Sequence, residues 1–198
     1  MARIKSAIEI ALERTESVKS DKSSISFFET RQKGKKLANE FLDSSKEGSK
    51  QTLQNEVKNA EKTEQASLKQ GIFDVLIYAL KLPDTEEDLA RVENAARGLQ
   101  DIINNNKFNN IAKQLSQVLR QFMDETAQYE EAIKRQYAPK LKQKEEEISR
   151  RIGRPVSLDP FQDPEFVAFY NQNMNAIKAN YSPVINQARE AAKELFQQ

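Results

Sequence analysis

Residues 108–137 read FNNIAKQLSQVLRQFMDETAQYEEAIKRQY, and this stretch decides the fold class. Its large apolar residues recur mainly three and four positions apart, which is the spacing of one face of an α-helix. Thirty residues at 1.5 Å each predict a helix of about 45 Å. We expect Pro139 to kink this helix or to start a new one, because proline lacks the backbone N–H and crowds the preceding turn.

A second helix is predicted directly before this one, over residues 89–103. Pro83 ends the preceding helix, Asp84 or Thr85 caps the new one, and the asparagines at 104–106 favour a turn after it. We expect the long helix to pack against this 89–103 helix within the chain. An intermolecular coiled coil with dimerisation is the alternative, because apolar residues every 3.5 positions favour a two-stranded supercoil.

The two ends of the chain also show helical spacing. Near the N-terminus we expect a first helix that ends in the polar stretch 20–24, and a second that starts at Ser26, because Ser26 and Glu29 form a capping-box pattern. Near the C-terminus, Asp163–Pro164 and Ser182–Pro183 each predict the start of a helix, with proline at its first position.

No strand pattern extends far enough to form a sheet, so we predict an all-α fold. The predicted architecture is an elongated helical bundle with one long helix and a charged helical arm, forming a single helical domain over residues 1–198. Its core is expected from residues 68–133 and 165–196. We expect 135–152 to be a solvated helical arm and 151–164 to be a proline-containing loop, which is longer than most connections between helices.

The composition removes most routes to catalysis. The chain has 31 Lys and Arg against 30 Asp and Glu, with no His and no Cys. It therefore has no imidazole base, no thiolate nucleophile and no disulfide, and no glycine-rich phosphate loop is present. We predict a protein that is not an enzyme and uses no cofactor or metal; a catalyst built on Lys, Glu and Tyr is the enzymatic alternative.

Cationic residues concentrate in residues 134–154, which contain eight Lys and Arg and only three carboxylates. Arginine side chains suit the recognition of phosphate or carboxylate. We predict a non-enzymatic interaction or scaffold protein that binds a protein partner, and the alternative is a nucleic-acid-associated accessory protein using the same basic segment. The balanced net charge of +1 argues against nucleic acid. The expected partner-binding residues are Lys134, Arg135, Arg150, Arg151, Arg154 and Phe161.

The N-terminal segment IKSAIEIALERT, residues 4–15, resembles the opening of an uncharacterised bacterial family of small helical proteins, a domain of unknown function. The resemblance implies no activity. The same segment alternates apolar and charged residues, which is not typical of a signal peptide. The longest apolar run, residues 75–80, is too short to span a membrane. We therefore expect a cytoplasmic protein without a membrane span.

Overall fold

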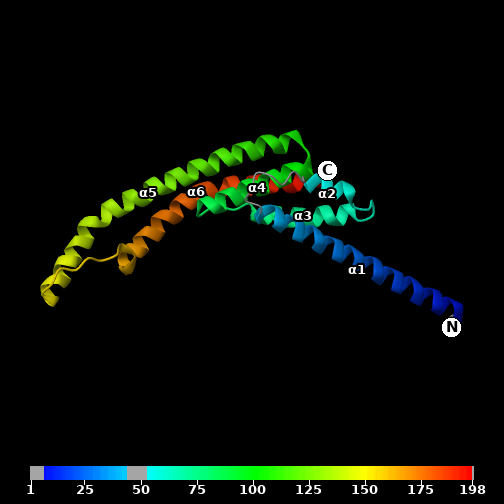
Figure 1. Cartoon of the computed structure of the whole chain (residues 1–198), viewed down its shortest axis with the longest axis horizontal. Helices are drawn as coiled ribbons and strands as arrows, with labels where there is room; N and C mark the ends of the chain where they lie inside the picture. Colours follow the sequence, from blue (N-terminus) through cyan, green and yellow to red (C-terminus); the bar gives the residue numbers. More distant parts are fainter. Residues whose placement is uncertain (1–6, 44–52, 198) are drawn as a thin grey trace, which may run out of the picture. The chain divides into compact units, whose positions relative to one another are not determined.

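The computed structural model describes the backbone of residues 7–43 and 53–197, and the side chains of residues 24–43 and 53–197. Within these ranges the chain is helical and contains no strand, which confirms the all-α prediction (Figure 1). The helices are α1 (Ala7–Asp43), α2 (Leu53–Asn59), α3 (Gln65–Ala79), α4 (Glu86–Ile103), α5 (Asn106–Ile152) and α6 (Pro164–Phe196), with a short 3₁₀ helix, η1 (Pro160–Gln162).

The contacts within the chain define two compact units. Unit 1 comprises residues 1–80 and 93–105, and unit 2 comprises residues 81–92 and 106–198. The first turns of α4 are grouped with unit 2 and the remainder of that helix with unit 1. A single helical domain over 1–198 stays a prediction.

In unit 1, α1 and α3 cross at two glycines. A Cβ atom built on Gly34 would overlap the carbonyl oxygen of Leu68, and one built on Gly71 would overlap that of Arg31. Only glycine therefore allows the two backbones to approach so closely. Beside the crossing, the Arg31 guanidinium lies 2.6 Å from the Asp74 carboxylate.

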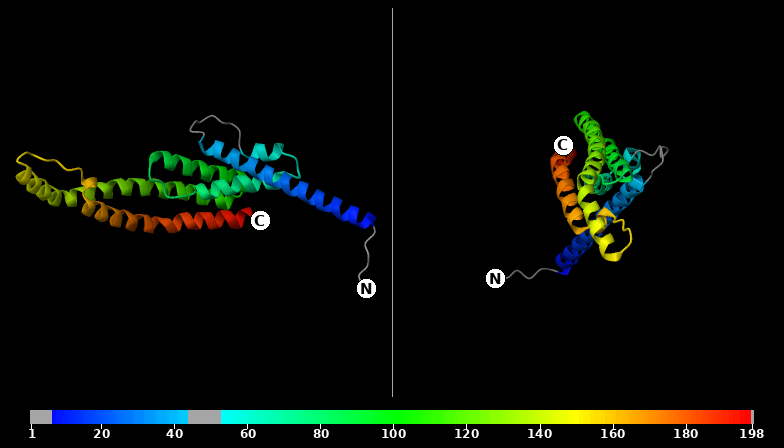
Figure 2. Two further views of the ribbon diagram at one scale, coloured as in Figure 1. Left: turned by 90° about the horizontal axis from the view of Figure 1, so that it is seen from below. Right: turned by 90° about the vertical axis from the view of Figure 1, so that its left-hand side faces the viewer.

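Helix α1 corrects the prediction of two helices with a break at 20–24. It is one continuous helix, and neither the polar stretch nor Ser26 interrupts it. The stretch contains no glycine or proline, and serine and charged residues cost only a few tenths of a kcal/mol each in a helix. The N-terminal half of α1 continues beyond the end of α3 (Figures 1 and 2).

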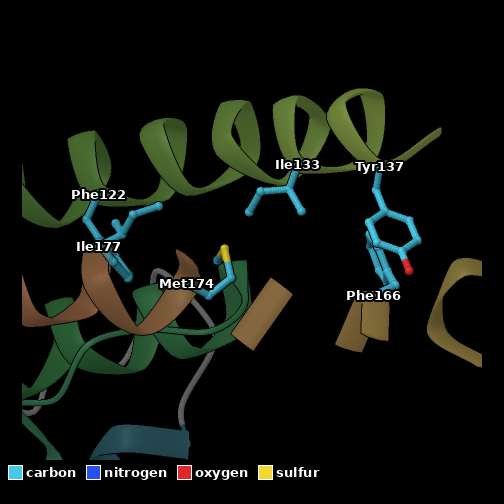
Figure 3. Close-up of a cluster of buried hydrophobic side chains, with 6 residues drawn as sticks. All are labelled: Phe122, Ile133, Tyr137, Phe166, Met174 and Ile177. Carbon is cyan, nitrogen blue, oxygen red and sulfur yellow. The ribbon is translucent and has the colours of Figure 1, made fainter. Parts of the chain in front are cut away.

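In unit 2, α5 and α6 form an antiparallel hairpin. Phe122 packs on Tyr181 with ring centroids 5.1 Å apart, and Tyr137 packs on Phe166 at 5.2 Å. Ile133, Met174 and Ile177 complete the buried cluster between these pairs (Figure 3). Within unit 2, α6 is therefore the helix that packs along α5.

Two prolines lie inside helices: Pro139, where the sequence predicted a kink or a new helix, and Pro183, where it predicted a helix start. Helix α5 continues through Pro139 to residue 152, and α6 continues through Pro183, so the predicted helix start at Ser182–Pro183 is wrong. Each proline leaves one backbone carbonyl without its helical donor. Packing on both sides outweighs this loss in α6, where Met174, Ile177 and Ile185 are buried, and the Ser182 hydroxyl donates to the carbonyl of Lys178 at 2.7 Å.

Three predicted helix boundaries are confirmed. The Thr85 hydroxyl accepts a hydrogen bond from the backbone N–H of Asp88 at 3.1 Å and so caps α4. Asn104 has a positive φ of 50° at the turn before α5. Asp163 caps α6, with Pro164 at its first position. Each of these residues satisfies a local requirement of a helix end, which is why sequence alone locates it.

No helix of the described residues is long and apolar enough to cross a membrane.

Candidate functional site

The candidate site lies at the tip of the α5–α6 hairpin, where the chain leaves α5 and returns to α6. Gly153 has a φ of +74°, a backbone conformation that glycine adopts without strain, and it turns the chain out of α5. The loop then folds back onto α5 through two bonds. The Ser149 hydroxyl accepts from the N–H of Val156 at 2.9 Å, and the Glu145 carboxylate accepts from the N–H of Leu158 at 2.8 Å.

Between the end of α5 and this loop lies a surface hollow of about 540 Å³. None of its lining residues is buried, so the hollow is open to solvent. Its walls are formed by Lys142, Glu145, Glu146, Ser149, Arg150, Gly153, Arg154, Pro155 and Val156.

Only some of the charged side chains of this hollow have a hydrogen-bond or ion-pair partner. Glu145 is occupied by the loop, and Arg150 lies at 4.0 Å from Glu146, at the limit of an ion pair. Lys142 and Arg154 have no ion pair or hydrogen-bonded side-chain partner among the described residues. Two cations of the hollow are therefore available to a ligand.

A polar cluster fastens the first turn of α6 to α5 on the neighbouring part of the tip. Lys144 donates to the Asp163 carboxylate at 2.7 and 2.9 Å and to Glu165 at 2.5 Å. The Tyr137 hydroxyl also donates to Asp163, at 2.8 Å, and Lys140 pairs with Glu165 at 3.0 Å. We call Tyr137, Lys144, Asp163 and Glu165 the tip clamp.

The pKa directions of the tip clamp are those of a fixed ion pair. The hydrogen bond to Asp163 raises the pKa of Lys144, and the bond from Lys144 lowers the pKa values of Asp163 and Glu165. Burial raises the pKa of Tyr137. Every shift moves away from neutral pH, whereas a general acid or base works best with a pKa near the operating pH. These groups are suited to holding the tip together rather than to transferring protons.

Aromatic rings pack around the start of α6, next to Tyr137 of the tip clamp. Phe161 in η1 meets Phe166 and Tyr170 edge-on, with ring centroids 5.2 Å apart in both pairs. Phe166 is fully buried, while Phe161 stays 47% exposed. Phe161 is therefore both part of the packing and a large apolar side chain that a partner can reach.

The structure brings together only some of the predicted partner-binding residues. Arg150 and Arg154 both line the hollow. Arg151 does not line it, and lies 3.8 Å from Glu147. Lys134 is bound to Glu130 at 2.8 Å, about five turns before the end of α5, and Arg135 is exposed on the same helix.

Sequence reasoning missed Lys142 and the tip clamp. It treated 135–152 as a solvated arm, and most of its side chains are indeed half-exposed or exposed, but Tyr137 is buried. One signal was present, because Tyr137 and Lys144 are seven residues apart and so lie two turns apart on one face of a helix. No sequence pattern, however, indicated that the loop folds back and brings Asp163 to this face.

A second exposed feature lies on α1 in unit 1. Ile25, Phe27 and Phe28 are 57%, 50% and 62% exposed. Thr30, Gly34 and Ala38, farther along the helix, are buried. Phe27 and Phe28 follow Ser26, where a helix was expected to start, but the sequence alone does not say that they remain uncovered.

A candidate metal centre is not present among the described residues, since no group of three or more acidic side chains converges there. Consecutive carboxylates on a helix point in different directions.

Comparison with known proteins identifies a family to which the chain is similar. A family of proteins of unknown function matches residues 54–194, which is more than two thirds of the chain. The matched range does not include the N-terminal segment on which the resemblance in the sequence analysis rested. No curated protein and no solved structure gave a significant match.

Proposed function

The chain belongs to DUF6657, a family of unknown function, and from this premise we propose that it is a non-enzymatic scaffold protein that binds a protein partner through α1. The observation that carries the proposal is the exposure of Ile25 and Phe28, three residues apart on one side of the helix. Exposed apolar groups that cluster in this way mark interaction sites more often than singly scattered ones do.

The geometry of α1 suits recognition by a groove or by another helix. Ile25 and Phe28 are three residues apart and so lie on the same side of the helix. Thr30, Gly34 and Ala38 occupy a different side, and Gly34 there lies against α3. An amphipathic helix that presents such anchors docks into an apolar groove on its partner.

The non-enzymatic part of the proposal is supported by the tip clamp. Tyr, Lys and carboxylate side chains converge there, and their pKa shifts oppose acid–base chemistry at neutral pH. The catalyst built on Lys, Glu and Tyr is therefore the weaker hypothesis.

The test is crosslinking of the full chain in its native lysate, followed by mass spectrometry. The double variant Ile25→Ser/Phe28→Ser is compared with Tyr129→Ser, a matched control on α5 whose side chain is 52% exposed. We expect a protein partner that survives nuclease, is lost in the double variant and is retained in the control. A partner that is captured equally by both variants would contradict the role of α1.

The alternative is a nucleic-acid-associated protein that uses the basic segment 134–154. Its support is that Lys142 and Arg154 have no ion-pair partner among the described residues and so can contact phosphate. Lys134 and Arg151 contribute less, because each lies beside a carboxylate. An electrostatic binder of this kind loses affinity steeply with added salt, and the triple variant Arg150→Glu/Arg151→Glu/Arg154→Glu should abolish its binding. Nucleic-acid affinity that is unchanged in this variant would remove the alternative.

Two further parts of the proposal concern assembly and location. A homodimer or coiled coil through α5 is tested by the mass of the chain in solution, since a monomer at micromolar concentration contradicts it. A cytoplasmic location is tested by fractionation of cells that express the full chain.

A further inference from the structure

The hollow at the hairpin tip differs from an ordinary charged surface because its shape is fixed. Two side-chain-to-backbone hydrogen bonds, from the N–H groups of Val156 and Leu158, hold the loop against α5. The tip clamp fixes the point where the chain enters α6. A site whose walls are held in this way loses little conformational entropy when a ligand binds.

The charges of the hollow favour an anion. Lys142, Arg150 and Arg154 stand against Glu145 and Glu146, and Glu145 is already bonded to the loop. The negative end of the helix dipole at the end of α5 accounts for Arg150 and Arg151 in its last turn. It does not account for Lys142, which lies about three turns earlier, or for Arg154, which lies beyond the helix, because the dipole effect is confined to the last turn.

The size and composition of the hollow select the kind of anion. About 540 Å³ is within the range of ligand sites, but the hollow is open, and Pro155 and Val156 give it an apolar wall. An open site with cations beside an apolar wall fits a short peptide that carries both carboxylates and aliphatic side chains. The interleaved Glu145 and Glu146 disfavour the continuous phosphate backbone of a nucleic acid, which is bound by an excess of cations.

We propose that the hollow binds an acidic peptide segment of a protein partner, with Lys142 and Arg154 contacting its carboxylates and Pro155 and Val156 its aliphatic side chains. This rests on the proposed function in that the chain binds a protein, and it adds the chemistry of the segment that is recognised. The site is separate from Ile25 and Phe28 of α1, so the two can be tested independently.

The experiment uses the full chain and a fluorescently labelled peptide of alternating glutamate and leucine, followed by anisotropy at low salt. A peptide with glutamine in place of glutamate is the neutral probe. The test variant is Lys142→Glu/Arg154→Glu. The matched control is Arg151→Glu/Lys193→Glu, which reverses two exposed cations outside the hollow and so changes the net charge by the same amount. Circular dichroism checks that the variants keep their helicity, which we expect because all four side chains are at the surface.

We expect the acidic peptide to bind in preference to the glutamine peptide, and its affinity to fall about tenfold or more in the test variant. The control should stay within about twofold of the unmodified chain, because exposed charges outside a site contribute little. Equal affinity for both peptides, equal loss in the test and control variants, or absence of binding would each overturn the proposal. A short single-stranded DNA that binds the hollow more tightly than the acidic peptide would also overturn it.

These outcomes are distinguishable from failure of the proposed function. If crosslinking finds a partner that depends on Ile25 and Phe28 while no acidic peptide binds, only the inference about the hollow fails. If the acidic peptide binds but substitutions in α1 leave every partner in place, the role of α1 fails and the hollow stands.

Discussion

The α1–α3 crossing and the α5–α6 hairpin hold their helices together by different means. At the crossing, Gly34 and Gly71 let two backbones touch. In the hairpin, the rings of Phe122, Tyr137 and Phe166 fill the space between the helices. A close contact between backbones tolerates no added atom, whereas a contact between side chains tolerates changes according to how deeply each one is buried. The crossing is therefore most sensitive to mutations that add atoms, and the hairpin to mutations that remove buried atoms.

The largest effect should follow removal of a buried ring from the hairpin. Phe166→Ala is expected to lower the free energy of unfolding by about 3–5 kcal/mol, because the ring is fully buried and leaves a cavity. Phe161→Ala is the matched control, and its half-exposed ring should cost only about 1 kcal/mol. Urea unfolding of both variants measures the difference, and equal losses would mean that burial does not govern the stack.

The next effect concerns an added methyl group at the crossing. Gly71→Ala should destabilise the chain by about 2 kcal/mol, because the new Cβ meets the rigid backbone of Arg31. Gly98→Ala is the matched control in the same unit. Its Cβ would meet the movable side chains of Leu76 and Phe41 at 2.8 and 3.0 Å, and alanine favours the helix by about 1 kcal/mol. Thermal unfolding should separate the two variants, and a stabilised Gly71→Ala would contradict the close contact.

The smallest effect is the pH dependence of the tip clamp. Bonding to Lys144 lowers the pKa values of Asp163 and Glu165 below their ordinary values of 3.8 and 4.5. The two carboxylates therefore contribute their full stabilisation of the fold above these ordinary values, and this stabilisation is lost as the pH falls through the lowered pKa values. The pKa of Lys144 is raised above 10.5, so its contribution is present at neutral pH and is lost only in strong base.

Asp163→Asn should therefore weaken the fall in stability below about pH 4. Urea midpoints measured from pH 2.5 to 6 check this. Glu131→Gln is the matched control, since its carboxylate is exposed and lies 3.8 Å from Lys134. If the urea midpoint falls equally with decreasing pH in Asp163→Asn and in Glu131→Gln, the clamp is not formed in solution.

Features that depend on neighbouring residues could be predicted from the sequence. The periodicity of 108–137, the cap at Thr85, the turn at Asn104 and the Asp163–Pro164 helix start all express local requirements, and all are present in the structure. The predicted helix start at Ser182–Pro183 was wrong for the same reason, and α5 likewise continues through Pro139. The local cost of a proline can be read from the sequence, but the packing that outweighs it cannot.

The candidate site was predictable only in part. Arg150 and Arg154 were identified because cations cluster there, but the sequence could not separate them from Arg151, which lies outside the hollow. That distinction depends on the direction in which the loop folds back, and so on the bonds of Ser149 and Glu145. Lys144 was hidden for a similar reason, because its partner Asp163 lies 19 residues away across the loop.

The antiparallel course of the hairpin also bears on the order in which it folds. Lys144 and Asp163 at the tip are separated by 19 residues, whereas Tyr181 lies 56 residues from Glu125, to which its hydroxyl donates. The entropy lost in closing a loop grows with its length, so the contacts at the tip cost the least to form first. We expect unit 2 to close like a zipper from the tip toward the far end, with each pair of turns shortening the loop that the next pair must close.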